Sequence, residues 1–169
     1  MDRRFIVLAL LVLALVAPAG ARAADCSGAD VVPAADNLPA IGQATLCLLN
    51  EQRASHHVAP LRASTKLAHA AQGHAGDMVR RRYFAHGNFG ARIAHTGWGR
   101  NRRQYTIGEN LAYGSGSGAT PRGIVAAWMN SAGHRANILQ RRFHAIGIGI
   151  VSGTPTGGAG ATYSTDFGS

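Results

Sequence analysis

The sequence predicts an α+β fold in which several helices pack on a small antiparallel sheet. Three observations lead to this prediction: two stretches with helical apolar spacing in the N-terminal half, a third after a Thr-Pro pair, and two alternating strands near the C-terminus. The length of 169 residues favours a single domain, and no internal repeat is present.

The first helix is expected to run from about Ile41 to Arg53 or Ser55, where apolar side chains recur at helical spacing. Pro60 prevents the helix from continuing much further, because proline lacks the backbone N–H that a helix interior needs. Residues 24–37 before it are predicted to form a leader that lies extended over the surface.

A second helix is expected to begin at Ser64 or Thr65, either of which can cap its N-terminus. Its spacing predicts that His74 faces the core, with Asp77 as a plausible partner, whereas His69 points towards solvent. The apolar stripe behind this prediction consists of Leu67, Ala70, Ala71, His74 and Met78.

The third helix is predicted to start at Thr120-Pro121, which supply an N-cap and a preset first turn. Gly133 is expected to end it, which leaves His134 directly after the break. The inward stripe of this helix contains Ile124, Val125, Trp128, Met129 and Ser131.

Shorter elements are expected between and after these helices. Residues 91–96 are predicted to form a short helix, residues 107–113 a strand, and residues 114–118 a flexible Gly/Ser spacer. Residues 146–151 and 161–167 alternate with a period of two, which predicts two strands paired as a hairpin.

Residues 1–23 are predicted to form a secretory signal peptide, with a basic start, an apolar core and an Ala-Arg-Ala cleavage signal. The apolar core is too short for a membrane span, so none is expected in the mature chain. The mature chain is therefore expected to be secreted, periplasmic or extracellular, with a leader over residues 24–42 and a domain over residues 43–169.

The sequence contains two cysteines, Cys26 and Cys47. An even number of cysteines in an exported chain favours a disulfide, which would pin the leader to the first helix. Two free buried thiols are the alternative. The absence of a C-x-x-C pattern argues against a redox or metal-binding role for the pair.

Several short motifs follow one another in a defined order: Leu49-Asn50-Glu51-Gln52-Arg53, Leu67-Ala68 through Met78, Phe84-Ala85-His86, Gly108-Glu109-Asn110-Leu111-Ala112, Trp128 to Leu139, Ile146-Gly147-Ile148-Gly149 and Asp166-Phe167-Gly168. Each is weak alone, but together they resemble secreted CAP-domain proteins (cysteine-rich secretory protein, antigen 5, pathogenesis-related 1) of the bacterial SCP-like type. The resemblance covers roughly residues 43–168. It implies a three-layer α-β-α sandwich, in agreement with the pattern of helices around a small sheet.

The resemblance also implies a central cleft in which two histidines and two carboxylates sometimes hold a divalent metal. By motif, His86 and His134 match the histidines and Glu109 matches the first carboxylate. The position of the second carboxylate is Ser131, whose hydroxyl is a weak metal ligand and no general base. Asn110, Ser131 and Arg135 are expected to line the same cleft.

The residue types leave three hypotheses open for this cleft. Two neutral imidazoles and one carboxylate can form a zinc site with a position left for water, so His86, His134 and Glu109 are candidate ligands for zinc or another divalent cation. Glu109 can instead be a catalytic base beside such a metal, as in a peptidase-like hydrolase. The third hypothesis is a hydrogen-bonded cluster that holds no metal.

No nucleophile with an adjacent base is evident in the sequence, and the second carboxylate of the resembling family is replaced. The leading hypothesis is therefore a non-enzymatic, exported binding module whose cleft receives a peptide, glycan or lipid. A metal-dependent hydrolase that uses His86, His134 and Glu109 is the alternative.

The chain carries a formal net charge of +9, and arginines gather at residues 80–82, 100–103 and 141–142. These clusters are either a solvated basic surface or a binding surface for an anionic polymer or lipid of the cell envelope. Nucleic acid would fit the charge but not the exported compartment, and no basic stripe interleaved with aromatic residues supports it.

Overall fold

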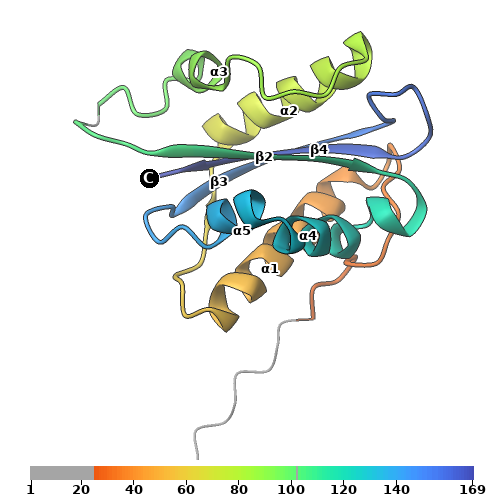
Figure 1. Ribbon diagram of the computed structural model, residues 1–169, viewed down its shortest axis with the longest axis horizontal. Helices are drawn as coiled ribbons and strands as arrows, with labels where there is room; N and C mark the ends of the chain where they lie inside the picture. Colours follow the sequence, from red (N-terminus) through yellow and green to blue (C-terminus); the bar gives the residue numbers. More distant parts are fainter. Residues whose placement is uncertain (1–24, 102) are drawn as a thin grey trace, which may run out of the picture.

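The computed structural model describes residues 25–101 and 103–169 of the chain, and the predicted signal peptide over residues 1–23 lies outside them. The predicted α+β fold is confirmed: a four-stranded sheet lies between two layers of helices (Figure 1). The strands, in the sheet order β1-β3-β4-β2, are β1 (Arg62–Ala63), β3 (Ala145–Ser152), β4 (Ala161–Gly168) and β2 (Ile107–Gly114). The helices are α1 (Leu38–Ser55), α2 (Thr65–Arg81), α3 (Phe89–His95), the 3-10 helix η1 (Gly116–Ala119), α4 (Pro121–Asn130) and α5 (Ala132–Ile138).

The sheet is mixed rather than purely antiparallel as predicted. The expected hairpin is confirmed, since β3 and β4 pair antiparallel, and β2 pairs antiparallel with the other side of β4. The difference is β1, which pairs parallel with β3 through two residues only. A strand of two residues is too short to produce an alternating pattern, which explains why the sequence did not reveal it.

Isoleucine and glycine alternate over residues 146–150 of β3, so one face of this stretch carries large apolar side chains and the other face carries none. Ile146 and Ile150 are buried in the main apolar core with residues of α1 and α4. On the opposite face, a Cβ atom at Gly147 would lie 2.0 Å from the backbone of α2, and one at Gly149 would lie 2.2 Å from it. The absence of two side chains therefore lets α2 lie directly on the sheet.

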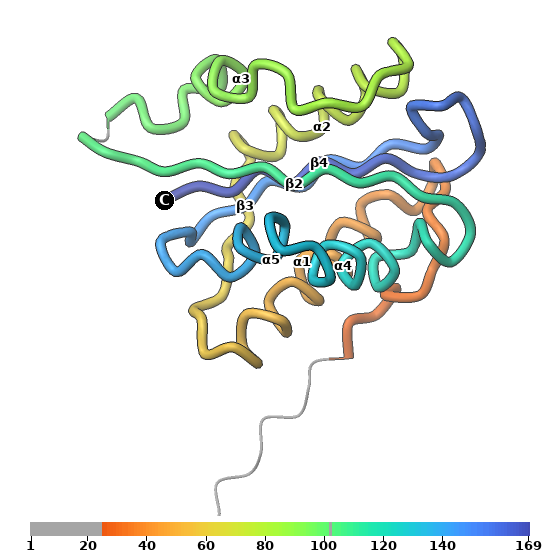
Figure 2. Tube along the Cα trace, in the orientation of Figure 1, coloured from red at the N-terminus to blue at the C-terminus, as the bar shows by residue number. Residues whose placement is uncertain are grey.

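The main core lies between the sheet and the layer formed by α1, α4 and α5 (Figures 1 and 2). Trp128 of α4 and Tyr163 of β4 are almost completely buried there and meet edge to face, with ring centroids 6.4 Å apart. Helices α2 and α3 form the other layer. The β4 strand follows this division, because Tyr163 and Phe167 enter the main core while Ser164 and Asp166 face α2.

Two predicted helix starts are confirmed at atomic level. Ser64 caps α2 by accepting a hydrogen bond from the backbone N–H of Leu67, and Thr120 caps α4 by accepting one from Gly123. The residues 114–118, predicted as a flexible spacer, mostly belong to η1.

The predicted end of the third helix at Gly133 is wrong. Helix α4 ends at Asn130, and Ser131 adopts an extended conformation with φ of −100° and ψ of 122°. Gly133 and His134 then lie inside α5, so His134 stands on a separate short helix. The break comes from the backbone of Ser131, at a residue whose type carries no strong stop signal.

The predicted disulfide between Cys26 and Cys47 is present, and it joins the N-terminal leader to α1. The leader is less extended than predicted, because residues 27–30 form a turn, and Asp30 forms an ion pair with Arg122 of α4. Among the residues that the structure describes, no helix is long and apolar enough to cross a membrane.

Candidate functional site

The candidate site is organised around Glu109, a buried carboxylate in the middle of the edge strand β2. The Glu109 side chain is only 2% exposed, and it lies on the face of the sheet that α2 covers. A buried ionised carboxylate is costly unless charged or hydrogen-bonding groups surround it. Glu109 therefore requires such partners in its surroundings.

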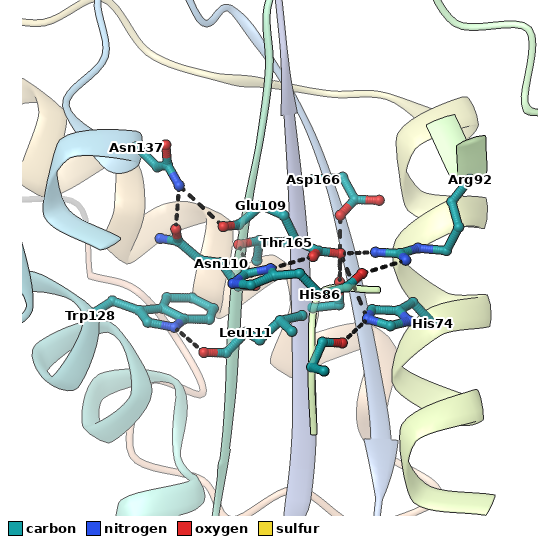
Figure 3. Close-up of polar contacts among 12 residues, drawn as sticks. His74, His86, Arg92, Glu109, Asn110, Leu111, Trp128, Asn137, Thr165 and Asp166 are labelled. Atoms are coloured by element: carbon teal, nitrogen blue, oxygen red, sulfur yellow. Dashed lines mark hydrogen bonds and ion pairs between the residues drawn. The ribbon is translucent and has the colours of Figure 1, made fainter. Parts of the chain in front are cut away.

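Both oxygens of Glu109 are occupied by partners from other parts of the chain (Figure 3). The Nδ1 atom of His86 lies 2.6 Å from Oε2, and the guanidinium of Arg92 donates to Oε1. Arg92 also donates to the backbone carbonyl of His86 at 2.7 Å. These three residues form a closed network in which Arg92 fixes both the carboxylate and the segment that carries His86.

The network determines which nitrogen of His86 is available. A carboxylate only accepts hydrogen bonds, so the contact with Glu109 assigns the proton to Nδ1. In the neutral imidazole, Nε2 is then an unprotonated acceptor. The His86 side chain is 58% exposed, so this acceptor belongs to the part of the site that meets solvent.

A second carboxyl group, that of Asp166, lies directly opposite Glu109 in the register between β2 and β4. Asp166 is fully buried, and Ser164 Oγ lies 3.5 Å from both its Oδ1 atom and Glu109 Oε1. Burial first, and the charge of Glu109 second, raise the pKa of Asp166 to about 8. At neutral pH Asp166 is therefore mostly protonated.

His74 of α2 also approaches this pair, as its predicted inward position requires. Its Nε2 atom donates to the carbonyl of Ala85 at 3.0 Å and lies 3.9 Å from Glu109 Oε1. Burial is the main cause that lowers the pKa of His74, followed by the charge of Arg92, so the imidazole is neutral at neutral pH. The close approach of α2 to the sheet brings this side chain within reach of β2.

The predicted pairing of His74 with Asp77 is wrong, because Asp77 has other partners. Its carboxylate accepts a hydrogen bond from Tyr83 Oη at 2.7 Å and weaker ones from Arg80 and Arg81 at 3.4 Å each. His69 is exposed, as predicted.

His134 and the predicted cleft residue Asn110 lie on the other face of β2. Asn110 is fully buried and donates to the backbone carbonyl of His134 at 3.1 Å, while Asn137 donates to Asn110 Oδ1 at 2.9 Å. Figure 3 shows Asn137 and Trp128 on the side of α4 and α5, and His74 and Arg92 on the side of α2. Burial, followed by the proximity of His86, lowers the pKa of His134.

The other two predicted cleft residues, Ser131 and Arg135, form no hydrogen bond or ion pair with His86 or Glu109 in the described part of the chain. Ser131 is half-buried at the junction of α4 and α5, and its side chain makes no capping hydrogen bond. Arg135 is exposed and donates to the carbonyl of Met129 at 3.0 Å. Arg135 therefore secures the α4–α5 junction.

The outer edge of β2 is covered by side chains rather than by another strand. Trp128 Nε1 donates to the carbonyl of Leu111 at 3.0 Å, and Asn137 donates to the carbonyl of Glu109 at 3.1 Å. These bonds satisfy backbone acceptors that an edge strand otherwise leaves open. They also hold α4 and α5 against the strand that carries the site.

In the described residues, the ligand atoms of His86, Glu109 and His134 do not form a group that lies within 4.8 Å of one another. Within residues 25–101 and 103–169, the only group of three or more potential ligands whose atoms lie within 4.8 Å of one another is Cys26, Cys47 and Glu51. Those cysteines form the disulfide, which removes their thiolates as ligands. Glu109 in turn is engaged by a guanidinium, which competes with any cation for its oxygens.

Sequence reasoning missed Arg92 and Asp166, and it treated His74 as a core residue. A signal for Asp166 was present: polar side chains occupy alternate positions of a strand that is buried along its whole length. Arg92 had no comparable signal, because only the placement of α3 over the sheet brings its side chain to Glu109.

An exposed aromatic pair lies beside His86. Phe84 and Tyr113 are 46% and 42% exposed, and their rings meet edge to face with centroids 4.9 Å apart. Phe84 and His86 belong to one segment that contacts β2 at two positions. Phe84 packs against Tyr113, and His86 is hydrogen-bonded to Glu109. Together, Phe84, His86 and Tyr113 form what we call the His86 surface.

Comparison with known proteins agrees with this architecture. The chain is 36% identical over 107 residues to the uncharacterized protein YkwD of Bacillus subtilis, a match that covers 62% of this chain and 40% of that protein. It is 33% identical to the uncharacterized membrane protein YlbC of the same organism, covering 62% of this chain and 30% of that protein. The chain thus matches less than half the length of either relative.

Solved structures with the same fold come from other bacteria. An extracellular protein containing an SCP domain from Bacillus anthracis superposes with a TM-score of 0.62 at 27% identity, covering 80% of this chain and 43% of that one. An outer surface protein from Borrelia burgdorferi superposes with a TM-score of 0.58 at 21% identity, covering 73% and 87% of the two chains. The second match shows a common fold only.

The sequence pattern of the cysteine-rich secretory protein family, known as CAP, matches residues 46–165. This range runs from α1 into β4, and it contains His86, Glu109 and His134. The chain therefore belongs to the cysteine-rich secretory protein family.

Proposed function

We propose that this protein is an exported binding module whose ligand is held at the His86 surface. Export is supported by the signal-like sequence of residues 1–23 and by the similar structures, which are described as extracellular or outer surface proteins. The observation that carries the proposal is the exposed His86 ring, held from behind by a buried and fully engaged carboxylate.

This arrangement favours binding over catalysis. Both oxygens of Glu109 already have partners, in His86, Arg92 and Ser164, which makes the carboxylate less available as a base for water. In the described residues, no hydroxyl or thiol is hydrogen-bonded to His86, and Ser131 makes no hydrogen bond with His134. The network instead fixes the position and tautomer of one exposed imidazole, which reduces the entropy that binding costs.

The His86 surface favours a glycan among the ligand classes that the sequence left open. An unprotonated Nε2 accepts a hydrogen bond from a hydroxyl group, and the Phe84–Tyr113 pair offers an aromatic surface to the C–H face of a sugar ring. Sugars combine both properties in one unit. A peptide is the second candidate, because a side-chain donor next to an apolar residue would meet the same requirements.

The test measures binding of a soluble oligosaccharide of N-acetylglucosamine to the mature chain, by calorimetry or by NMR shifts of the His86 surface. His86→Ala is expected to weaken binding at least about tenfold, since it removes a charge-supported acceptor. His144→Ala, at an exposed histidine that has no contact with His86 or Glu109, serves as the matched control and should leave binding unchanged. Turnover of a peptide or ester that is lost in His134→Ala would instead establish the hydrolase alternative.

A further inference from the structure

A groove of about 780 Å³ is lined by residues of α2, of α3 and of the segment between them. Both helices lie on the same side of the sheet (Figure 2). Its walls carry Arg80, Arg81 and Arg92, together with His69 and His95. Asp77 is the only carboxylate among the residues that line it. The groove therefore has an excess of positive charge in a space large enough for a small molecule.

The arginines at its mouth are free to turn towards a ligand. The side chains of Arg80 and Arg81 are 71% and 72% exposed, and their contacts with Asp77 are long, at 3.4 Å each. Exposed ion pairs of this kind contribute little stability, so replacing them by contacts with a ligand costs little. Asp77 keeps a short hydrogen bond from Tyr83 Oη at 2.7 Å, which stabilises the carboxylate without the arginines.

Arg92, which also lines the groove, has one donor without a partner. The two terminal nitrogens of Arg92 donate hydrogen bonds to Glu109 and to the carbonyl of His86, whereas the buried Nε atom has no hydrogen-bond partner. A buried unsatisfied N–H is destabilising unless an acceptor reaches it. Gly73 of α2 also lines the groove, and a Cβ atom there would meet no other atom within 4 Å.

We propose that this groove binds a phosphate group carried by a small polar molecule, such as a phosphorylated sugar or polyol. A phosphate presents oxygens in several directions, and guanidinium groups from α2 and α3 surround the groove from different sides. The groove is much larger than a phosphate ion, so the remaining volume would hold the organic part. The groove shares Arg92 with the network behind the His86 surface, so the variants that test the groove are placed at Arg80 and Arg81, which are not part of that network.

The experiment titrates the mature chain with glucose 6-phosphate and with inorganic phosphate at constant ionic strength, followed by NMR. Amide shifts are expected at the end of α2 and along α3, with tighter binding of the sugar phosphate. Arg80→Gln/Arg81→Gln is expected to weaken binding of the sugar phosphate about tenfold, from the loss of two charge-assisted contacts.

The matched control is Arg141→Gln/Arg142→Gln, which removes the same charge from an exposed pair outside the groove. Its binding should remain within about twofold of the original chain. Equal weakening in both double variants would overturn the proposal, because it would reduce the effect to net charge. Binding to phosphatidylglycerol vesicles without binding to either soluble phosphate would also overturn it, in favour of a membrane surface.

Discussion

Arg53 and Arg92 are both withdrawn from solvent, on opposite faces of the sheet, and they are stabilised in different ways. Arg53 is completely buried in α1, and it donates to the backbone carbonyls of Ala59, Ile138, Gln140 and Phe143. Arg92 is 22% exposed and faces the carboxylate of Glu109, and its Nε has no partner.

The difference separates a structural charge from a functional one. Every nitrogen of the Arg53 guanidinium has an acceptor, and the four carbonyls belong to the loop after α1, to the end of α5 and to the loop before β3. Arg53 thus connects three segments, and no nitrogen of its guanidinium is left without a partner for a ligand to use. Arg92 belongs to the cluster around Glu109, in which Arg92 Nε and Asp166 Oδ2 have no hydrogen-bond partner. This cluster lies next to both the His86 surface and the groove between α2 and α3. A buried polar group without a partner calls for an explanation, and a bound ligand is one.

The largest effect is expected from Arg53→Met, which keeps the apolar stem but removes all donors. Four carbonyls would lose a hydrogen bond, and each buried acceptor left without a partner costs about 1–3 kcal/mol. We expect the free energy of unfolding to fall by at least about 3 kcal/mol, measured by urea denaturation. A loss below about 1 kcal/mol would contradict the structural role of Arg53.

The same substitution at Arg92 is expected to have a smaller effect on stability. Arg92→Met removes one charge-assisted contact with Glu109, worth about 2 kcal/mol, but the carboxylate keeps His86 as a partner. Ligand binding at the His86 surface should weaken as well, because the segment that carries His86 loses its anchor. Equal stability losses for Arg53→Met and Arg92→Met would remove the distinction between the two regions.

A third prediction concerns the pH dependence of stability, tested by Asp166→Asn. The pKa of Asp166 is about 8 in the folded chain against an ordinary value of 3.8, mainly because the group is buried. Between these values the folded chain holds a proton that the unfolded chain releases. The stability contributed by this group is therefore fully present below pH 3.8 and is lost as the pH rises towards about 8.

Asp166→Asn should remove this loss, so the slope of the unfolding free energy against pH becomes less negative by up to about 1.4 kcal/mol per pH unit. The measurement is a series of urea denaturations between pH 4 and 8, with Ser152→Ala as a surface control on β3. Parallel slopes for the variant and the original chain would show that Asp166 is ionised when folded.

The sequence predicted most of the fold because its signals are local. The caps at Ser64 and Thr120 and the alternation in β3 and β4 depend on neighbouring residues, and all appear where expected. The two misplaced features, the strand β1 and the end of α4, depend on tertiary contacts and on the backbone of one residue.

The site could be predicted only in part, for the same reason. The family resemblance named His86 and Glu109, which do form a hydrogen bond. It could not reveal Asp166 opposite Glu109, because that contact follows from the strand register, nor Arg92, because that contact follows from where α3 lies. The use of His86, Glu109 and His134 as metal ligands stays a prediction, and the present geometry does not assemble them.

Gly147 and Gly149 have a consequence for engineering this protein. Stability designs commonly replace strand glycines with β-branched residues, since glycine weakens a strand. Here any new side chain would lie within 2.0–2.2 Å of the α2 backbone and would lift that helix from the sheet. His74 would then withdraw from Glu109, and α2 would shift against α3, so these two positions should be excluded from any library meant to preserve binding.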